Sequence, residues 1–174
     1  MNRNYWLIGA IVLVVPLITI GFSMMKTEAA QERPFQASGP EAVTFEGPDP
    51  DVCGEGRLKV DVEGTGEATH LGEYQITRRH CFNPGNNPPT FEDGIFEMTA
   101  ANGDVLSGTY AGALADVLEV DQNGNPVVIV IDAPYVITGG TGRFADAAGE
   151  GETEGIFNLQ TQQGDFTMEG WIRY

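Results

Sequence analysis

From Cys53 to the C-terminus, apolar and polar residues alternate in short runs that glycine, asparagine and proline repeatedly interrupt. Alternation with a period of two is typical of β-strands with one buried face, and these interrupting residues favour turns. Almost no segment keeps the spacing of an amphipathic helix for more than two turns. In a chain with 23 glycines, this pattern predicts an all-β domain.

The alternation predicts eight strands, near residues 57–63, 69–79, 91–100, 104–112, 115–121, 127–138, 152–161 and 165–173. Short turns between most neighbours favour an up-and-down antiparallel order. Large residues repeatedly face glycine across the expected pairs, and glycine allows a sheet to bend until it closes. We therefore expect an eight-stranded antiparallel barrel, whose interior is either just filled or just able to hold one small ligand.

Cys53 and Cys81 are the only two cysteines of the chain. Outside the cytoplasm such a pair is expected to oxidise, and two isolated cysteines do not have the spacing of a zinc site. We expect a disulfide across the open end of a hairpin in which the two cysteines lie opposite each other. That register pairs Val60 with Tyr74, and no metal site is expected.

Two further turns predict the registers of their hairpins. A three-residue loop at residues 101–103 ends on a glycine, as such loops prefer. A two-residue turn is expected at residues 163–164. The resulting pairs are Met98 with Leu106 in the first hairpin, and Phe157 with Gly170 in the second.

The side chains that face inward in these registers are almost all apolar. They are Leu58, Val60, Val62, Tyr74, Ile76, Phe96, Met98, Leu106, Tyr110, Leu118, Phe157, Leu159, Phe166, Met168 and Ile172. If the barrel is packed solid, they form its core; if a cavity remains, they form an apolar pocket with phenol groups as polar points. The candidate ligand-lining residues are Tyr74, Phe96, Met98, Tyr110, Phe157, Met168 and His70. Residues 127–131 are apolar on both faces, so we expect an arm, a loop or another subunit to cover their outer side.

The chain carries 25 acidic and 9 basic residues, a formal net charge of −16. Nucleic-acid partners are excluded, because phosphate contacts need clustered lysine and arginine. Most strand acids have the outward parity, which predicts an acidic shell around an apolar lumen.

His80, beside Arg78 and Arg79, is expected to form a local basic spot that pairs with neighbouring carboxylates. No serine nucleophile motif and no inward catalytic pair is evident, which favours binding over catalysis.

A glycine-rich turn comprises Gly139, Gly140, Gly142 and Arg143. A phosphate-binding loop would continue with Lys and Ser or Thr into a long helix, and neither follows here. We therefore expect a structural turn that leads into one short helical turn, with Arg143 holding nearby carbonyls or carboxylates.

Residues 7–25 are uncharged, between Arg3 and Lys26. A basic start, an apolar stretch and small residues before Ala30 are typical of a secretory signal, whereas an apolar stretch of this length can also remain as a membrane anchor. In either case we expect the remainder outside the cytoplasm: secreted, periplasmic or anchored to the membrane only by residues 7–25. The expected organisation is a signal or anchor at 1–30, a proline-rich extended arm at 31–52 and a β-barrel domain at 53–174.

The stretch from Ile137 to Ala145, Ile-Thr-Gly-Gly-Thr-Gly-Arg-Phe-Ala, continues into Ala148-Gly149-Glu150-Gly151. It resembles the signature of the dirigent and allene oxide cyclase barrel superfamily, in its secreted bacterial branch. The segment from Gly64 to Gly72 and the terminal Gly170-Trp171-Ile172 extend the similarity over nearly all of residues 53–174. Only the glycine-rich turn transfers residue by residue, and its role in the family looks structural.

The resemblance implies an eight-stranded antiparallel barrel of calycin-like shape, often trimeric in the plant branches. Some members bind an unstable hydrophobic intermediate and steer its cyclisation or coupling without a cofactor. Our first hypothesis is an exported barrel that binds a small apolar ligand or acts as a non-catalytic scaffold. The alternatives are a cofactor-free cyclase or isomerase and a filled barrel with a purely structural role. We expect no cofactor, and a homo-oligomer, trimer or dimer, is compatible with each hypothesis.

Overall fold

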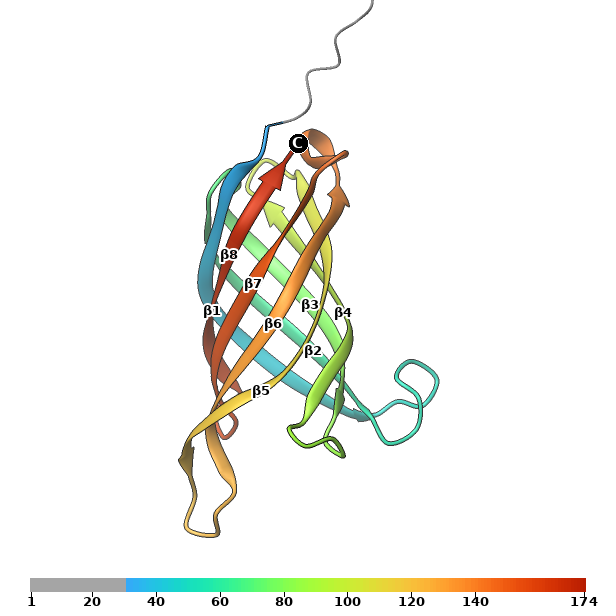
Figure 1. Cartoon of the computed structure of the whole chain (residues 1–174), viewed down its shortest axis with the longest axis vertical. Coiled ribbons are helices and arrows are strands. Elements are labelled where there is room, and N and C mark those ends of the chain that lie inside the picture. The colour runs from blue at the N-terminus through green and yellow to red at the C-terminus, as the bar shows by residue number, and fades with distance from the viewer. Residues whose placement is uncertain (1–30) are drawn as a thin grey trace, which may run out of the picture.

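The computed structural model describes residues 31–174, which form eight strands and one short 3-10 helix, η1 (Figure 1). The expected signal or anchor at residues 1–30 lies outside the described residues. No helix within residues 31–174 is long and apolar enough to cross a membrane. The elements are β1 (Arg33–Pro48), β2 (Leu58–Ala68), β3 (Gly72–Asn83), β4 (Thr90–Ala100), β5 (Val105–Val120), β6 (Pro126–Gly140), η1 (Gly142–Phe144), β7 (Ala148–Asn158) and β8 (Gln163–Arg173).

Each strand pairs antiparallel with the next one along the chain, and β8 pairs with β1 to close the barrel. The predicted all-β, eight-stranded, antiparallel up-and-down barrel is therefore confirmed. The C-terminus, η1 and the short β2–β3 and β4–β5 turns lie at one end, which we call the closed end (Figure 1). The β1–β2, β3–β4, β5–β6 and β7–β8 connections lie at the other end, which we call the open end.

The first strand lies in the segment predicted to be an extended arm, and that prediction needs correction. Residues 33–48 pair with β2 on one side and with β8 on the other, so the barrel begins near Arg33 and not at Cys53. Phe35, Ala37 and Glu41 are buried, which shows a period of two. The prolines of the segment are exposed and thus do not disturb the inner face. Because β1 lies between β8 and β2, it does not cover the outer side of β6.

The predicted strands 104–112 and 115–121 are one continuous strand, β5. The number eight is thus correct although its members differ, because β1 replaces the strand lost by this fusion. The distal parts of β5 and β6 project beyond the open end as a twisted ribbon (Figure 1). Leu118, predicted to face inward, lies on this ribbon with an exposed fraction of 56%.

The register is confirmed at one predicted hairpin and differs at two. Met98 pairs with Leu106 across the β4–β5 turn, as predicted. In the β2–β3 hairpin Val60 pairs with His80, six residues from the expected partner, because the chain turns at residues 69–71. In the β7–β8 hairpin Phe157 pairs with Gly164, again six residues away, because the turn spans residues 159–162. Both shifts are even, so the predicted inner and outer faces are preserved.

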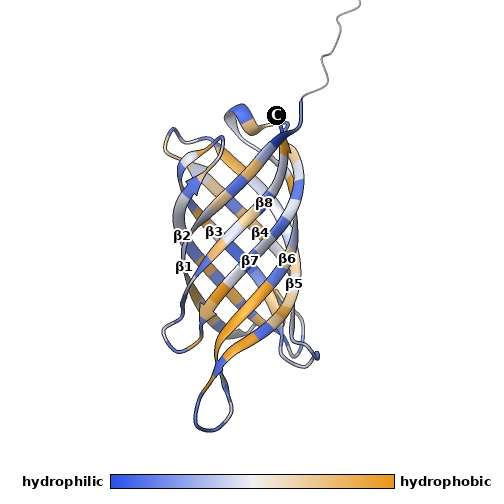
Figure 2. Cartoon of the chain, turned by 60° about the vertical axis from the view of Figure 1, so that its left-hand side comes forward, coloured by the Kyte–Doolittle hydropathy of each residue, from blue (hydrophilic) through white to orange (hydrophobic). Residues whose placement is uncertain are grey.

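The closed half of the lumen is packed with apolar side chains. Among those with almost no exposure are Phe35, Ile76, Met98, Leu106, Tyr135, Ile137, Phe144, Met168 and Ile172. Phe144 of η1 packs against the ring of Tyr174 at 5.1 Å between centroids and covers this end. Apolar residues are concentrated in the open-end parts of β5 and β6 (Figure 2); of these, Leu118 and Val120 of β5 are exposed, as is Ile156 of the neighbouring β7.

The glycine-rich turn connects β6 to η1. Gly139 and Gly142 have φ angles of 143° and 58°, which favour glycine. A Cβ on Gly140 would overlap the carbonyl oxygen of Val105. The Arg143 Nε lies 3.5 Å from a carboxylate oxygen of Asp104. These contacts are structural, and they lie at the closed end.

Candidate ligand-binding site

A cavity of about 360 Å³ occupies the open half of the lumen. Its wall is mainly apolar and comes from every strand except β8. The apolar lining residues are Val43, Phe45, Val60, Val62, Phe82, Pro89, Phe91, Leu114, Pro126, Ile129, Ile131, Phe157 and Leu159, and the polar ones are Glu41, Arg78, His80, Tyr110, Asn158 and Gln162.

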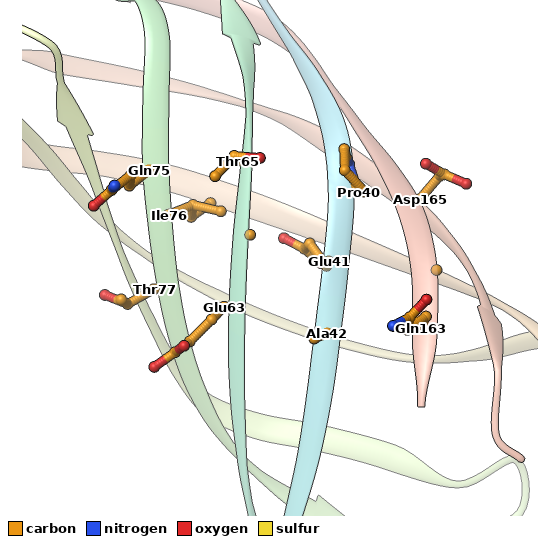
Figure 3. A pocket seen from close by; sticks show the side chains of 12 residues that line it. Pro40, Glu41, Ala42, Glu63, Thr65, Gln75, Ile76, Thr77, Gln163 and Asp165 are labelled. Carbon is orange, nitrogen blue, oxygen red and sulfur yellow. The ribbon is translucent and has the colours of Figure 1, made fainter. Parts of the chain in front are cut away.

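A second hollow lies on the outer surface over β8, β1, β2 and β3 (Figure 3). Its polar walls include Glu63, Thr65 and Gln75, which are exposed strand residues. Small-molecule sites are concave, mainly apolar and equipped with a few converging polar groups. The lumen cavity has this composition and the outer groove does not, so we take the lumen cavity as the candidate site.

Glu41 of β1 and Arg78 of β3 form an ion pair in the wall of the cavity. The Arg78 Nε lies 3.1 Å from a Glu41 carboxylate oxygen, and both side chains are almost fully buried. The arginine plane also stacks on the Phe166 ring, with 4.1 Å between Cζ and the ring centroid. A buried charge without a partner would be very costly, so each of these charges depends on the other.

The hydrogen-bonding capacity of this pair is largely unused. Both Glu41 carboxylate oxygens, and the Nε and Nη2 of Arg78, are buried without a hydrogen-bond partner. The ion-pair separation is short, but its angles do not make a hydrogen bond. Buried polar atoms nearly always have a hydrogen-bond partner. Four neighbouring buried atoms without one are therefore an exception.

Gly64 of β2 leaves the space that the Glu41 side chain occupies. A Cβ at this position would lie 2.8 Å from the Glu41 Cγ and 2.6 Å from the carbonyl oxygen of Pro40. Burial raises the pKa of Glu41 from 4.5 to about 7, and the positive charge of Arg78 partly opposes this shift. The carboxyl group can therefore gain or lose a proton near neutral pH.

His80 and Tyr110 form a second polar pair farther along the lumen. The His80 Nδ1 lies 2.8 Å from the Tyr110 hydroxyl oxygen, and the imidazole packs on Phe91 with 5.1 Å between centroids. Burial, together with the positive charge of Arg78, lowers the pKa of His80 to about 4. Burial also raises the pKa of Tyr110. Both groups are thus neutral at pH 7 and joined by one hydrogen bond.

The order of residues along the strands places the ion pair at the inner end of the cavity. On β1, Glu41 is followed towards the open end by the lining residues Val43 and Phe45. On β3, Arg78 is followed in the same direction by His80 and Phe82. The cavity therefore has a polar floor, where the packed half begins, and apolar walls that lead to the mouth.

The structure separates the predicted ligand-lining residues into three groups. Tyr110 and Phe157 line the cavity. The side chains of Tyr74, Phe96, Met98 and Met168 are buried in the packed half, where the Tyr74 hydroxyl donates to the carbonyl oxygen of Ser38. His70 lies in the β2–β3 turn at the closed end, with Nε2 2.9 Å from the carbonyl oxygen of Pro34.

Three polar residues of the site were assigned elsewhere by the sequence analysis. Glu41 fell in the expected arm, and Arg78 and His80 were assigned to a basic spot with Arg79. Of that spot, only Arg79 lies outside the barrel, where it pairs with Asp61 at 3.1 Å. The missed signal was the parity of β3, because Arg78 and His80 share the inward parity of Tyr74.

The predicted disulfide between Cys53 and Cys81 is present, with 5.4 Å between the Cα atoms. It ties the β1–β2 connection to β3, next to His80 and Phe82 of the cavity wall. Cys53 lies ahead of β2, so the bond does not join paired strand positions as expected. Such bonds persist in oxidising compartments outside the cytoplasm.

The arrangement offers an apolar chamber, one ion pair and one neutral hydrogen-bonded pair, and its lining contains no serine, threonine, cysteine or lysine. Residues 31–174 contain no cluster of three or more side chains that could hold a metal ion. No family model, curated protein or solved structure matches the chain.

Proposed function

We propose that this protein binds one small, mainly apolar molecule in the open half of its barrel. The observation that carries the proposal is the cavity of about 360 Å³, with apolar walls and all its charged groups at the inner end. Its volume lies within the range of small-molecule sites, roughly 300 to 1,000 Å³. Eight strands also make the smallest common barrel that can hold one ligand.

A pair of leucine substitutions on β5 tests this proposal. Leu114 lines the cavity, whereas Leu118 lies on the exposed ribbon of the same strand. We expect Leu114→Trp to fill the cavity and weaken the binding of a fluorescent apolar probe by about tenfold or more, because a bulky ring replaces ligand volume. Leu118→Trp should leave binding unchanged.

The readout is a fluorescence titration of the purified protein, combined with mass spectrometry of any molecule released on denaturation. Equal probe affinity in the wild type and in both variants would refute binding in the lumen. Absence of saturable probe binding by the folded wild type would refute the proposed function as a whole.

A second candidate, a cofactor-free cyclase or isomerase, is supported by one specific observation. Glu41 has a pKa of about 7 inside the cavity, which suits a general acid or base at neutral pH. The resemblance of the glycine-rich turn to the dirigent and allene oxide cyclase superfamily supports the same candidate. Turnover of a reactive hydrophobic substrate that persists unchanged in Glu41→Gln would remove Glu41 from any catalytic role.

We also propose that the protein is exported. The disulfide supports an oxidising compartment, and the uncharged stretch at residues 7–25 supports either secretion or an N-terminal anchor. Fractionation of the native host with an antibody distinguishes these cases. Rapid thiol labelling of unreduced protein from the native host would contradict export.

A further inference from the structure

We propose that the cavity selects ligands whose buried end is one uncharged group that both donates and accepts hydrogen bonds, such as a carboxamide or a hydroxyl. This inference rests on the proposed ligand-binding function and names the ligand class. The Glu41–Arg78 pair at the floor of the cavity would receive this head group, and the apolar walls would receive a hydrocarbon tail.

The first argument rests on the atoms of Glu41 and Arg78 that have no hydrogen-bond partner. Glu41 carries carboxylate oxygens, which accept, and Arg78 carries N–H groups, which donate; these atoms lie just beneath the cavity surface, so a head group reaches them when the two side chains shift apart. A head group that donates to Glu41 and accepts from Arg78 satisfies atoms of both residues together. An ester or ketone can satisfy only the arginine, because it has no donor.

The second argument rests on the opposite charges of Glu41 and Arg78. Glu41 and Arg78 neutralise each other at 3.1 Å, so the floor has no net charge when the carboxyl is ionised. A ligand carboxylate would place a second negative charge beside Glu41, and a ligand ammonium would place a second positive charge beside Arg78. Like charges buried together are strongly unfavourable, so the floor discriminates against both ions.

The remaining polar groups on the wall do not change this balance. His80 and Tyr110 are neutral at pH 7 and already hydrogen-bonded to each other. The other polar lining residues, Asn158 and Gln162, carry no charge. Arg78 is thus the only positive charge and Glu41 the only negative charge among the cavity-lining residues.

The test compares four probes with the same hydrocarbon tail and different ends: octanamide, methyl octanoate, octanoate and octylammonium. Their affinities are measured at pH 8 by competition with a fluorescent apolar probe. At this pH Glu41 is mainly ionised, because its pKa is about 7. We expect octanamide to bind about tenfold more tightly than methyl octanoate, and both ions to bind more weakly than either.

Glu41→Gln provides the sharpest variant, because it removes one charge and keeps nearly the same shape. Arg78 then has no anionic partner, so octanoate should bind at least tenfold more tightly than it does to the wild type. Glu63→Gln is the matched control, since Glu63 is a nearby carboxylate on the outer face of β2. It should leave the order of affinities unchanged.

A second variant, Glu41→Leu with Arg78→Met, replaces the whole pair with apolar side chains. Replacing both partners of a buried pair is tolerated better than removing one. Octanamide should lose its advantage over methyl octanoate in this variant, whereas methyl octanoate should still bind. This measurement does not depend on the folding of Glu41→Gln.

The outcomes distinguish the proposed head-group selectivity from the proposed ligand binding on which it rests. If octanoate binds the wild type as tightly as octanamide, or if all four probes bind equally, the selectivity is refuted and apolar ligand binding stands. If none of the probes binds and none displaces the apolar probe, both are refuted.

Discussion

Two buried groups in the cavity are predicted to give the folding stability opposite dependences on pH. Glu41 has a pKa of about 7 in place of 4.5, so between these values the folded chain holds a proton that the unfolded chain has lost. His80 has a pKa of about 4 in place of 6.5, so in that window the unfolded chain holds the additional proton. Stability rises with pH wherever the unfolded state binds more protons, and falls in the reverse case.

The magnitudes follow from the size of the two shifts. At 1.36 kcal/mol per pKa unit, each group contributes about 3 kcal/mol across its window. The Glu41 contribution is complete at low pH and is lost as pH rises through 7. The His80 contribution is unfavourable at low pH and disappears as pH rises through 6.5. In the wild type the two effects should nearly cancel between pH 4.5 and 6.5, because folding exchanges a proton on His80 for a proton on Glu41.

Single substitutions should reveal how each group alone makes the free energy of unfolding depend on pH. In Glu41→Gln, where His80 is the only one of the two groups left to titrate, the free energy of unfolding should rise by about 2 kcal/mol from pH 4.5 to 6.5. In His80→Gln, where only Glu41 titrates, it should fall by about 3 kcal/mol from pH 4.5 to 7. The double variant should be flat again. Urea unfolding at half-unit steps of pH provides the measurement.

A result that refutes this reasoning is easy to recognise. If Glu41→Gln keeps the pH profile of the wild type, Glu41 does not carry the proton assigned to it. If His80→Gln shows no loss of stability with rising pH, the two groups do not titrate in opposite directions.

Three further predictions concern the free energy of unfolding, two of them together with probe binding. Replacing both Cys53 and Cys81 by serine should lower the free energy of unfolding by about 2 to 4 kcal/mol in urea, because the disulfide closes a loop with a sequence separation of 28 residues; a change below 1 kcal/mol would contradict this. Gly64→Ala should cost about 1 to 3 kcal/mol and weaken probe binding, because its methyl group would press on β1 beside the cavity; full stability by calorimetry would show that β1 can move aside. Tyr74→Phe should cost about 1 kcal/mol through the hydrogen bond to Ser38, with unchanged probe affinity, since this side chain lies in the packed half.

The fold could be predicted from the sequence because strand alternation is robust to errors of register. Two hairpins pair six residues away from the prediction, yet Val60 and Phe157 still face the lumen. A shift by an even number of residues changes the partners of a side chain and leaves its face unchanged. The predicted apolar interior therefore survived, apart from Leu118, which lies beyond the end of the barrel.

The polar floor of the cavity could not be predicted in the same way. An inward arginine on β3 breaks the rule that charged residues face water, and only a partner from another strand makes it tolerable. That partner, Glu41, lies 37 positions earlier in the sequence, on a strand hidden by its prolines. Local patterns contain no information on which two distant charges will meet, so the pair becomes visible only when β1 is placed beside β2.

The packed closed half makes the lumen a tube with a single opening. A ligand whose polar group binds at the floor must enter with that group first and leave with its hydrocarbon tail first, through the same opening. Such a geometry suits storage or presentation rather than passage, because nothing can pass from one end of the barrel to the other. A tail longer than the cavity would protrude at the mouth, beside the β5–β6 ribbon (Figure 1).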